Sequence, residues 1–329
     1  MKVPLVSIIV PSRDSEKTIG KLLDSIFSMN YPKQKYEVII VDSSIDKTQE
    51  IVKNYPVKLI KISRAKRRNI ALACNRGIKF SKREFIAFVD SDCVVSKDWL
   101  KDLVVNFSND RVACVGGKVT TTGNIYDTYA QNAYKSPMRE VNKKYITDAS
   151  NFHKGMWPIG ANFMIRKEVM REVKCFDEKL EFYEEVDLFW RICKRGYKIV
   201  LVPNAKVEHS YKRGIFQMFR TYLRYGKGCG YFCKKYKISR FAKVRTILIL
   251  GILIYYLSSI VLFFPFFKKW LPIYFFILPL APYFYLSLYY FSKLKEPRDV
   301  ILFPFFDFVF CGVAYIIGFI SSFIELPKE

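Results

Sequence analysis

Short hydrophobic runs and helix-like segments alternate through the first 90 residues of the chain. Four runs have the length and composition of buried strands, at residues 6–10, 38–41, 57–62 and 85–89. Between them, apolar residues recur at the spacing of helices packed on a sheet, at residues 19–29, 46–53 and 69–80. This alternation predicts an α/β fold with a Rossmann-like, mostly parallel sheet, in which ligands bind outside the carboxyl ends of the strands.

The next hundred residues have a less regular pattern. Helices are predicted at 99–107, 167–173 and 184–195, and strands at 113–120 and 198–202, around a loop-rich stretch at 121–155. We therefore interpret residues 1–212 as a single α/β domain.

Long apolar segments dominate the remainder of the chain. Three of them, at residues 246–267, 270–291 and 300–324, are predicted to be transmembrane helices. The first contains 22 residues without a charge, which as a helix measures about 33 Å. The third segment, 300–324, contains one acidic residue, Asp307. The hydrophobic pattern leaves the function of Asp307 open.

The segment before these spans, residues 213–245, mixes aromatic and basic side chains. Eleven basic residues and no acid fall between Lys212 and Arg245. The spacing predicts amphipathic helices that lie in a membrane interface, and a packing helix with a solvated basic face is the alternative.

The excess of basic residues affects the functional interpretation only through its location along the chain. The chain has 54 Lys and Arg against 30 Asp and Glu, a balance that often indicates nucleic-acid binding. Here the bases cluster beside an apolar segment, so we expect anionic membrane lipids as partners and no nucleic acid. The loop charges place the first domain on the cytoplasmic side of a multi-pass cell-membrane protein and the C-terminus outside, and the spans leave room for a homo-oligomer.

Compartment is also indicated by the cysteines and the N-terminus. Eight cysteines include no Cys-x-x-Cys pair, as is typical of a reduced cytosolic domain. The apolar run at residues 3–10 is too short for a cleavable signal peptide and is better interpreted as a strand.

Two acids directly follow the fourth predicted strand. Asp90 and Asp92 lie one residue apart, and alternate residues of a strand point to the same side. Two carboxylates at such a strand end can hold a divalent cation against a diphosphate. A solvated exit from strand to turn is the plain alternative.

An ordered set of motifs resembles glycosyltransferase family 2, whose members have the GT-A nucleotide-sugar-binding fold. The resemblance covers roughly residues 3–212 and rests on the order of the motifs. They are Val6-Ser7-Ile8-Ile9-Val10-Pro11, Val41-Asp42-Ser43-Ser44, Arg68-Asn69, Asp90-Ser91-Asp92, Gly160-Ala161-Asn162, Phe176-Asp177-Glu178, Glu184-Glu185-Val186-Asp187 and Gly196-Tyr197.

The resemblance implies a donor site at the strand ends. A Mg²⁺ or Mn²⁺ ion would be held by Asp92, with help from Asp90, and His209 is a further candidate ligand. The expected donor nucleotide-binding residues are Pro11, Arg13, Asp42, Arg68, Asp90 and Arg220. Arg220 stands in Gln217-Met218-Phe219-Arg220-Thr221, which resembles the Gln-x-x-Arg-Trp element of processive synthases except that Thr221 replaces the aromatic residue.

The second acidic cluster is implied to supply the catalytic base. Its second position, Glu185, would take the proton from an acceptor hydroxyl, although the family usually has Asp there. Glu184 competes for this role, and Asp187 either joins them or orients the helix. An acid-rich helix N-terminus favoured by the macrodipole is the structural alternative.

The expected activity is that of an inverting, metal-dependent hexosyltransferase. By resemblance it takes a sugar from a nucleotide-diphosphate donor, with UDP-sugar favoured and GDP-sugar as the alternative. The acceptor is expected to be a hydroxyl of a lipid-linked or polymeric glycan at the cytoplasmic membrane face. Two other functions stay open: a polyprenyl (dolichyl) phosphate sugar synthase, and a non-catalytic membrane-surface binding protein with a degenerate transferase domain.

Overall fold

The computed structural model describes most of the chain, and it divides into two compact units. The described residues are 3–64, 69–121, 125, 128–129, 141–210, 214–263, 285–292, 294 and 297–324. The first unit comprises residues 1–132 and 137–212, and the second comprises residues 133–136 and 213–329. Each unit is described by itself.

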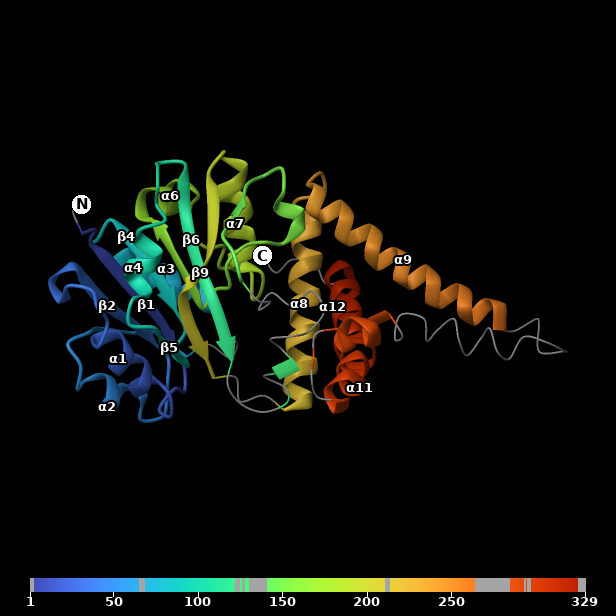
Figure 1. Ribbon diagram of the computed structural model, residues 1–329, viewed down its shortest axis with the longest axis horizontal. Coiled ribbons are helices and arrows are strands. Elements are labelled where there is room, and N and C mark those ends of the chain that lie inside the picture. Colours follow the sequence, from blue (N-terminus) through green and yellow to red (C-terminus); the bar gives the residue numbers. More distant parts are fainter. Residues whose placement is uncertain are drawn as a thin grey trace. The chain divides into compact units, whose positions relative to one another are not determined.

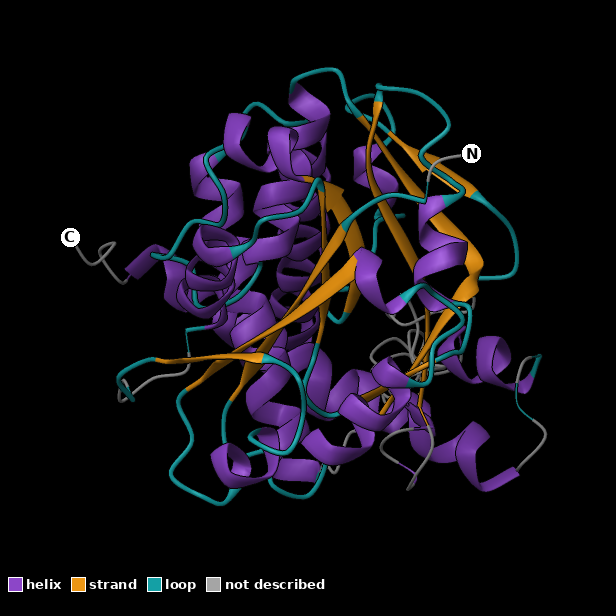
Figure 2. Cartoon of the chain, turned by 90° about the vertical axis from the view of Figure 1, so that its left-hand side faces the viewer, coloured by secondary structure: helices purple, strands orange, loops and turns teal. Residues whose placement is uncertain are grey.

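One curled sheet runs through the first unit (Figure 1), and its twist is visible in Figure 2. Its strands are β1 (Val6–Ser12), β2 (Tyr36–Asp42), β3 (Lys58–Lys61), β4 (Phe85–Val89), β5 (Cys93–Val95), β6 (Val112–Thr121), β7 (Tyr145–Thr147), β8 (Asn162–Arg166) and β9 (Lys198–His209). They are ordered β3-β2-β1-β4-β8-β6-β9-β5, and β7 pairs with β9. The sheet curls so far that β5, the last strand in this order, packs against the helix that follows β1.

Helices cover both faces of this sheet. They are α1 (Ile19–Phe27), α2 (Thr48–Val52), α3 (Ile70–Phe80), α4 (Trp99–Val104), α6 (Lys167–Glu172) and α7 (Glu184–Lys194), with short 3₁₀ turns η1 (Lys33–Lys35) and η2 (Phe152–Lys154). Side chains of α1 and α4 form one core with Ile8 and Val10. On the opposite face, α3 lies so close that a methyl group at Gly77 would come within 2.5 Å of the Cγ2 atom of Ile9. Alternate residues of β1 therefore contact different helices, as the period of a strand requires.

A chain of aromatic rings fills the face that α7 covers. Phe88 of β4 stacks on Phe163 of β8 at 4.8 Å, and Phe163 meets Phe189 of α7 edge to face at 5.3 Å. Phe176 contacts Phe88 from the other side at 5.5 Å. Because these rings are buried, α7 has a fixed position relative to the end of β4.

A buried amide braces the sheet where the pairing of β6 and β9 shifts register. The Asn162 side chain accepts a hydrogen bond from Trp99 Nε1 at 2.8 Å and donates to the carbonyls of Lys118 and Ala205 at 3.0 and 2.9 Å. A methyl group at Gly117 would lie 1.8 Å from the Ala205 oxygen, so only glycine fits beside this bulge. The Gly160-Ala161-Asn162 motif therefore has a structural part in its last residue.

The elements agree with the sequence-based prediction in the first half of the unit and depart from it later. The four predicted N-terminal strands and the helices between them are present, with ends displaced by one or two residues. The sheet is mixed, because four of its strand pairs are parallel and four are antiparallel among the described residues. The prediction of a mostly parallel sheet is wrong, because the antiparallel strands β5, β7 and β8 lie in the less regular second half of the unit and were not predicted from the sequence.

The second unit consists of helices α8 (Ile215–Lys235), α9 (Arg240–Phe263), α11 (Pro297–Phe305), the π-helical segment η3 (Phe306–Gly312) and α12 (Val313–Ile324). Helices α8 and α12 touch backbone to backbone through glycines. A methyl group at Gly226 would lie 1.9 Å from the Tyr315 oxygen, and one at Gly318 would lie 1.9 Å from the Leu223 oxygen. Such close approach needs residues without side chains on both helices. Helix α8 is therefore a packing helix on this face, while Phe216 near its start is 81% exposed.

No helix among the described residues combines the length and the apolar character needed to span a bilayer. The prediction of three transmembrane helices is accordingly not supported. The expected span at 300–324 is divided among α11, η3 and α12, and Pro304 lies inside α11. Most of the expected span at 270–291 lies outside the described residues.

Candidate active site

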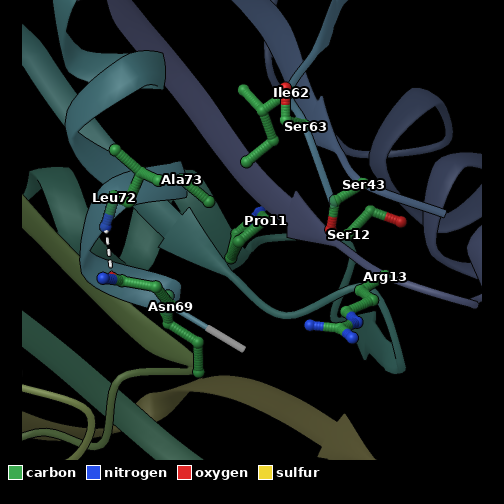
Figure 3. Close-up of a pocket in the computed structure, with 10 residues that line it drawn as sticks. Pro11, Ser12, Arg13, Ser43, Ile62, Ser63, Asn69, Leu72 and Ala73 are labelled. Atoms are coloured by element: carbon green, nitrogen blue, oxygen red, sulfur yellow. Dashed lines mark hydrogen bonds between the residues drawn. The ribbon is translucent and has the colours of Figure 1, made fainter. Parts of the chain in front are cut away.

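A pocket opens at the carboxyl ends of β1, β2 and β3 (Figure 3). It is lined by Pro11, Ser12, Arg13, Ser43, Ile62, Ser63, Asn69, Ile70, Leu72 and Ala73. Pro11 and Arg13, both predicted from the sequence, belong to this lining. The predicted phosphate contact Arg68 lies outside the described residues.

Asp42 stands at the end of β2 and is fully buried. Its carboxylate accepts hydrogen bonds from the Ser44 backbone at 3.0 Å, the Ser44 hydroxyl at 2.6 Å and the Gln49 amide at 2.8 Å. Charge-assisted bonds of this kind hold the loop after β2 in one conformation. In this structure Asp42 holds the loop that follows β2, and its predicted contact with the nucleotide base stays a prediction.

A hydrogen-bonded path joins that loop to the Asp90-Ser91-Asp92 turn. Thr48 donates to Asp46 at 2.5 Å and accepts from the Ser15 backbone at 2.9 Å. The Ser15 hydroxyl then contacts the Ser91 hydroxyl at 2.7 Å, and both serines are buried. Neither periodicity nor a motif predicts this contact, because it joins residues 76 positions apart. It fixes the turn that carries both acids to the loop after β1.

A second side-chain contact links the loop after β1 to the segment after β3. Arg64, the first residue of the basic run 64–68, makes two hydrogen bonds to the Asp14 carboxylate, at 2.7 and 2.8 Å. This contact holds the pKa of Asp14 below its usual value. Asp14 has a positive φ of 54°, an uncommon conformation that its hydrogen bonds to Ser44 and Ile45 help to maintain.

Asp90, Asp92 and His209 form a compact group of cation ligands. The His209 Nε2 atom lies 3.5 Å from an Asp90 oxygen and 3.4 Å from an Asp92 oxygen. The imidazole is 4% exposed, whereas the two carboxylates are 26% and 39% exposed. A tight turn from Asp90 O to Cys93 N and the register of β5 on β9 bring the three residues together.

The chemistry of this group fits a divalent cation with oxygen and nitrogen ligands. Ligand atoms of Asp92, Cys93 and His209 lie within 4.8 Å of one another. Burial raises the pKa of the Cys93 thiol well above its usual value, and the nearby Asp90 and Asp92 charges raise it further. A thiol that keeps its proton is a poor ligand, so the two aspartates and His209 are the better set for Mg²⁺ or Mn²⁺.

Glu185 is the half-buried acid of the second cluster, in the first turn of α7. Burial raises its pKa above 4.5, the value of an ordinary glutamate, and the negative charge of Asp90 adds to the rise. Hydrogen bonds with its own backbone N–H and with Glu184 oppose this change. Asp90 therefore connects the cation ligands electrostatically with Glu185.

The other two acids of the cluster have different surroundings. Glu184 is 8% exposed and Asp187 is 1% exposed. Asp187 forms a 2.7 Å ion pair with Arg191, one turn further along α7, and Arg191 also donates to the Val173 carbonyl. We infer that Asp187 holds α7 in place and that Glu185 is the better placed base.

Two asparagines, Asn69 at the N-cap of α3 and Asn75 within it, hold the segment that leads to Glu185, and the motif analysis included only the first of them. Asn75 donates to the Phe176 carbonyl at 3.0 Å and accepts from the Phe176 N–H at 3.0 Å. Asn69, which also lines the pocket, caps α3 and donates to the Glu178 carbonyl at 2.9 Å. The sequence marked Asn69 through the Arg68-Asn69 motif and its N-cap position before a helical pattern, whereas nothing marked Asn75.

Arg220 belongs to the second unit, where it is exposed on α8. Its predicted contact with a donor diphosphate stays a prediction.

Comparison with known proteins identifies the family of the chain. The family described as Glycosyl transferase family 2 matches residues 7–174, which is half of the chain. The chain belongs to glycosyl transferase family 2. Its members transfer sugars, so the protein is a glycosyltransferase, as the ordered motifs predicted.

The individual relatives described below have low sequence identity to this chain. Glycosyltransferase AglE of Haloferax volcanii is 27% identical over 237 residues, which cover 69% of this chain and 73% of AglE. A Methanococcus voltae enzyme named dolichyl N-acetyl-alpha-D-glucosaminyl phosphate 3-beta-D-2,3-diacetamido-2,3-dideoxy-beta-D-glucuronosyltransferase is 23% identical over 240 residues, or 70% of this chain and 74% of that enzyme.

Among solved structures, the mannosyltransferase PcManGT from Pyrobaculum calidifontis, in complex with GDP-Man and Mn²⁺, has a similar fold. The TM-score is 0.61 at 17% identity, with 97% of this chain and 87% of that chain covered. At this identity the likeness supports the fold alone, which is a GT-A-like α/β domain with a mixed sheet.

Proposed function

We propose that this glycosyltransferase is metal-dependent and inverting, and that it moves a sugar from a nucleotide-diphosphate donor to a hydroxyl of a glycan. The observation that carries the proposal is the position of Asp90. Its carboxylate lies 3.5 Å from His209 Nε2, among the cation ligands, and its charge raises the pKa of Glu185. The groups needed at the leaving diphosphate and at the incoming hydroxyl therefore share one site.

The donor half of the reaction falls to the strand ends. The pocket beside Pro11 and Arg13 has the mixture of polar and apolar lining residues that a nucleotide site needs. Asp90, Asp92 and His209 would hold Mg²⁺ or Mn²⁺, which stabilises negative charge on a departing diphosphate when bound. UDP-sugar is our favoured donor, and GDP-sugar, the class bound by the Pyrobaculum enzyme, is the alternative.

Glu185 supplies the second half of the reaction. An ionised carboxylate within reach of an acceptor hydroxyl takes its proton as the oxygen attacks the anomeric carbon. The raised pKa strengthens Glu185 as a base, because a carboxylate that holds protons more firmly removes one more readily. A single displacement of this kind inverts the anomeric configuration.

The charges around Glu185 also favour a neutral acceptor. Glu184 and Asp90 both lie near enough to act on its pKa. A phosphate acceptor would bring further negative charge to this cluster and would need no base. This argues against a polyprenyl-phosphate sugar synthase and for a hydroxyl acceptor.

The lipid carrier of the acceptor glycan is proposed from the name of one relative. The Methanococcus voltae relative is named for a dolichyl-phosphate-linked sugar acceptor, which supports a lipid-linked glycan. The cytoplasmic location of the site and association of subunits stay predictions.

The test is a donor screen with purified protein. UDP-, GDP- and CDP-sugars are incubated with Mn²⁺, and both binding and release of the nucleotide diphosphate are measured. We expect one donor class to bind and to be hydrolysed slowly by water, and we expect Asp92→Asn to abolish both. Hydrolysis that needs no metal, or that survives Asp92→Asn, would contradict metal dependence. Absence of any donor binding would support the non-catalytic alternative instead.

A further inference from the structure

Three loops supply walls of the pocket, and each of them follows one of the parallel strands β1, β2 and β3 (Figure 3). Arg13 comes from the first loop, Ser43 from the second and Ser63 from the third. The pairing of the strands ends before these three residues. The shape of the pocket at this edge therefore depends on what joins the loops to one another.

The first two loops are joined by several hydrogen bonds. The Asp14 backbone donates to the Ser44 hydroxyl at 2.7 Å, and the Ile45 backbone donates to the Asp14 carboxylate at 3.3 Å. The Glu16 backbone adds a bond to the Asp46 carboxylate at 3.1 Å. These two walls are therefore fixed to each other without the third.

The third loop depends on one arginine. Among the described residues, the side-chain hydrogen bonds of residues 63 and 64 are the two that Arg64 makes to the two carboxylate oxygens of Asp14, at 2.7 and 2.8 Å. A guanidinium that makes two parallel bonds to a carboxylate fixes direction as well as distance. Asp14 thus contacts the second loop and the third loop at the same time.

The exposure of this pair indicates that its main use is not the stability of the fold. The side chains of Arg64 and Asp14 are 34% and 40% exposed, and exposed ion pairs add little to the free energy of unfolding. Asp14 nevertheless has a positive φ of 54°. Uncommon backbone conformations of this kind often occur where a ligand site needs a fixed shape.

We propose that Asp14 and Arg64 are positioning residues for the donor nucleotide, and that their ion pair holds the three loops together before a nucleoside diphosphate binds. Neither side chain has to touch the ligand. Loops that are already joined lose less conformational freedom when the pocket is filled, so the pair makes nucleotide binding tighter. This inference rests on the proposed function, because it assigns residues that support the donor side of the same site.

A direct contact between Arg64 and a donor phosphate is the competing explanation, and the variant Asp14→Asn separates the two. Asparagine tolerates the positive φ and can still accept the bond from Ile45, but it lacks the charge that binds Arg64. If Arg64 binds phosphate itself, this variant frees the guanidinium, and nucleotide binding stays equal or improves. If the pair positions the loops, nucleotide binding weakens.

The experiment measures the binding of UDP, GDP and CDP in Mn²⁺ by calorimetric titration. The nucleotide that binds the parent most tightly is then used for Asp14→Asn, Arg64→Ala, the double variant and Arg195→Ala. Arg195 is the matched control, because its 3.1 Å pair with Glu172 is similarly exposed, at 39% and 45%, and neither residue lines the pocket.

We expect Asp14→Asn and Arg64→Ala each to weaken nucleotide binding about fivefold, which is the effect of ordering one or two further side chains on binding. The double variant should bind no more weakly than either single variant, because both changes remove the same contact. The melting temperature and the binding of Mn²⁺ without nucleotide should match those of the parent. Arg195→Ala should match the parent in every measurement.

Salt provides a readout that a general structural defect would not move. Exposed ion pairs weaken as salt is added, so the difference in nucleotide binding between the parent and Asp14→Asn should shrink between low salt and about 1 M NaCl. A difference that stays constant in salt would contradict the proposal.

Other results would overturn the proposal in different ways. Parent-level binding by Asp14→Asn together with weakened binding by Arg64→Ala would assign Arg64 to a direct phosphate contact. Parent-level binding by both variants would show that the pair has no part in the donor site, and a lowered melting temperature in both would assign it to the fold. A parent that binds none of the three nucleotides would instead refute the proposed function.

Discussion

The donor side and the acceptor side of this site are built in opposite ways. On the donor side, Asp42 accepts three hydrogen bonds, and the hydroxyls of Ser15 and Ser91 are joined inside the protein. On the acceptor side, the carboxyl group of Glu185 has a raised pKa, and apart from the chain neighbours of Gly160 it is the only described group within 4 Å of a methyl group placed there.

The difference follows from what each side has to do. A nucleotide and a cation are bound best by groups that already have their final positions, since little entropy is then lost on binding. A catalytic base has to keep some affinity for a proton, which requires an environment that disfavours its charge. The buried acid Asp42 of the donor side is therefore already hydrogen-bonded within the protein, while Glu185 on the acceptor side retains an electrostatic cost.

Replacing the base should give the largest effect. Glu185→Gln removes the proton acceptor but keeps the size of the side chain, so sugar transfer should fall by about 10²–10⁴-fold. Donor binding in Mn²⁺ should stay at the parent level in a calorimetric titration. Glu184→Gln is the matched comparison, and a greater loss in that variant would assign the base to Glu184.

Asp187 tests whether the rest of the acidic cluster is structural. Asp187→Asn leaves the buried Arg191 without its 2.7 Å ion pair. We expect the free energy of unfolding to fall by about 3 kcal/mol, since one partner of a buried pair is left uncompensated. Transfer by the folded protein should change little.

Asp110→Asn is the control for that measurement, because Asp110 pairs with Arg166 at 3.6 Å while fully exposed. Its denaturation curve should overlay that of the parent. A catalytic loss without a stability loss in Asp187→Asn would place Asp187 on the acceptor side.

The Ser15–Ser91 contact tests the preorganised donor side. Ser91→Ala removes one buried hydrogen bond from the turn that carries Asp90 and Asp92. The loss of about 1 kcal/mol expected for such a bond corresponds to Mn²⁺ binding weakened about fivefold, measured by electron paramagnetic resonance. Ser15→Ala should have a similar effect, and the double variant should be no worse than either alone. Additive losses would mean that the two hydroxyls act independently; Ser28→Ala, at an exposed serine, serves as control.

The smallest effect expected is on stability as a function of pH. The folded protein holds the pKa of Glu185 above its unfolded value, so its ionised form destabilises the fold. This cost is fully present above the folded pKa and disappears as pH falls below the unfolded pKa. Glu185→Gln should thus melt at a higher temperature than the parent near neutral pH, and the difference should vanish in acid. The parent's transfer rate should fall as Glu185 takes up its proton, at a pH above the pKa of an ordinary glutamate.

Sequence reasoning succeeded where local pattern and function coincide. The strand that ends at Asp42 is marked by a continuous β-branched run and the strand before Asp90 by a continuous apolar run, and both acids were noted because they follow such runs. The helix beginning at Glu184 was likewise visible from its apolar period. Sequence reasoning could not assign different roles to Glu184, Glu185 and Asp187. These acids differ in burial and in the ion pair of Asp187 with Arg191, which only the structure shows.

The same reasoning failed where contacts are distant along the chain. Asn75, Ser15 and Ser91 are ordinary polar letters, and only tertiary structure places each beside its partner. In the second unit, the described helices do not support the predicted membrane spans, and the sequence did not predict the close packing of α8 on α12 at Gly226 and Gly318. The apolar content of a segment does not determine which helix packs against it.

The four N-terminal strands, the acids at their ends and the family were predicted from the sequence, because each depends on residues that are neighbours along the chain. The curl of the sheet brings His209 to Asp90 and Asp92, and the packing of α7 brings Glu185 under the influence of Asp90. These relations were decided by the tertiary structure, since charge and burial act through space over a few ångströms regardless of position in the sequence.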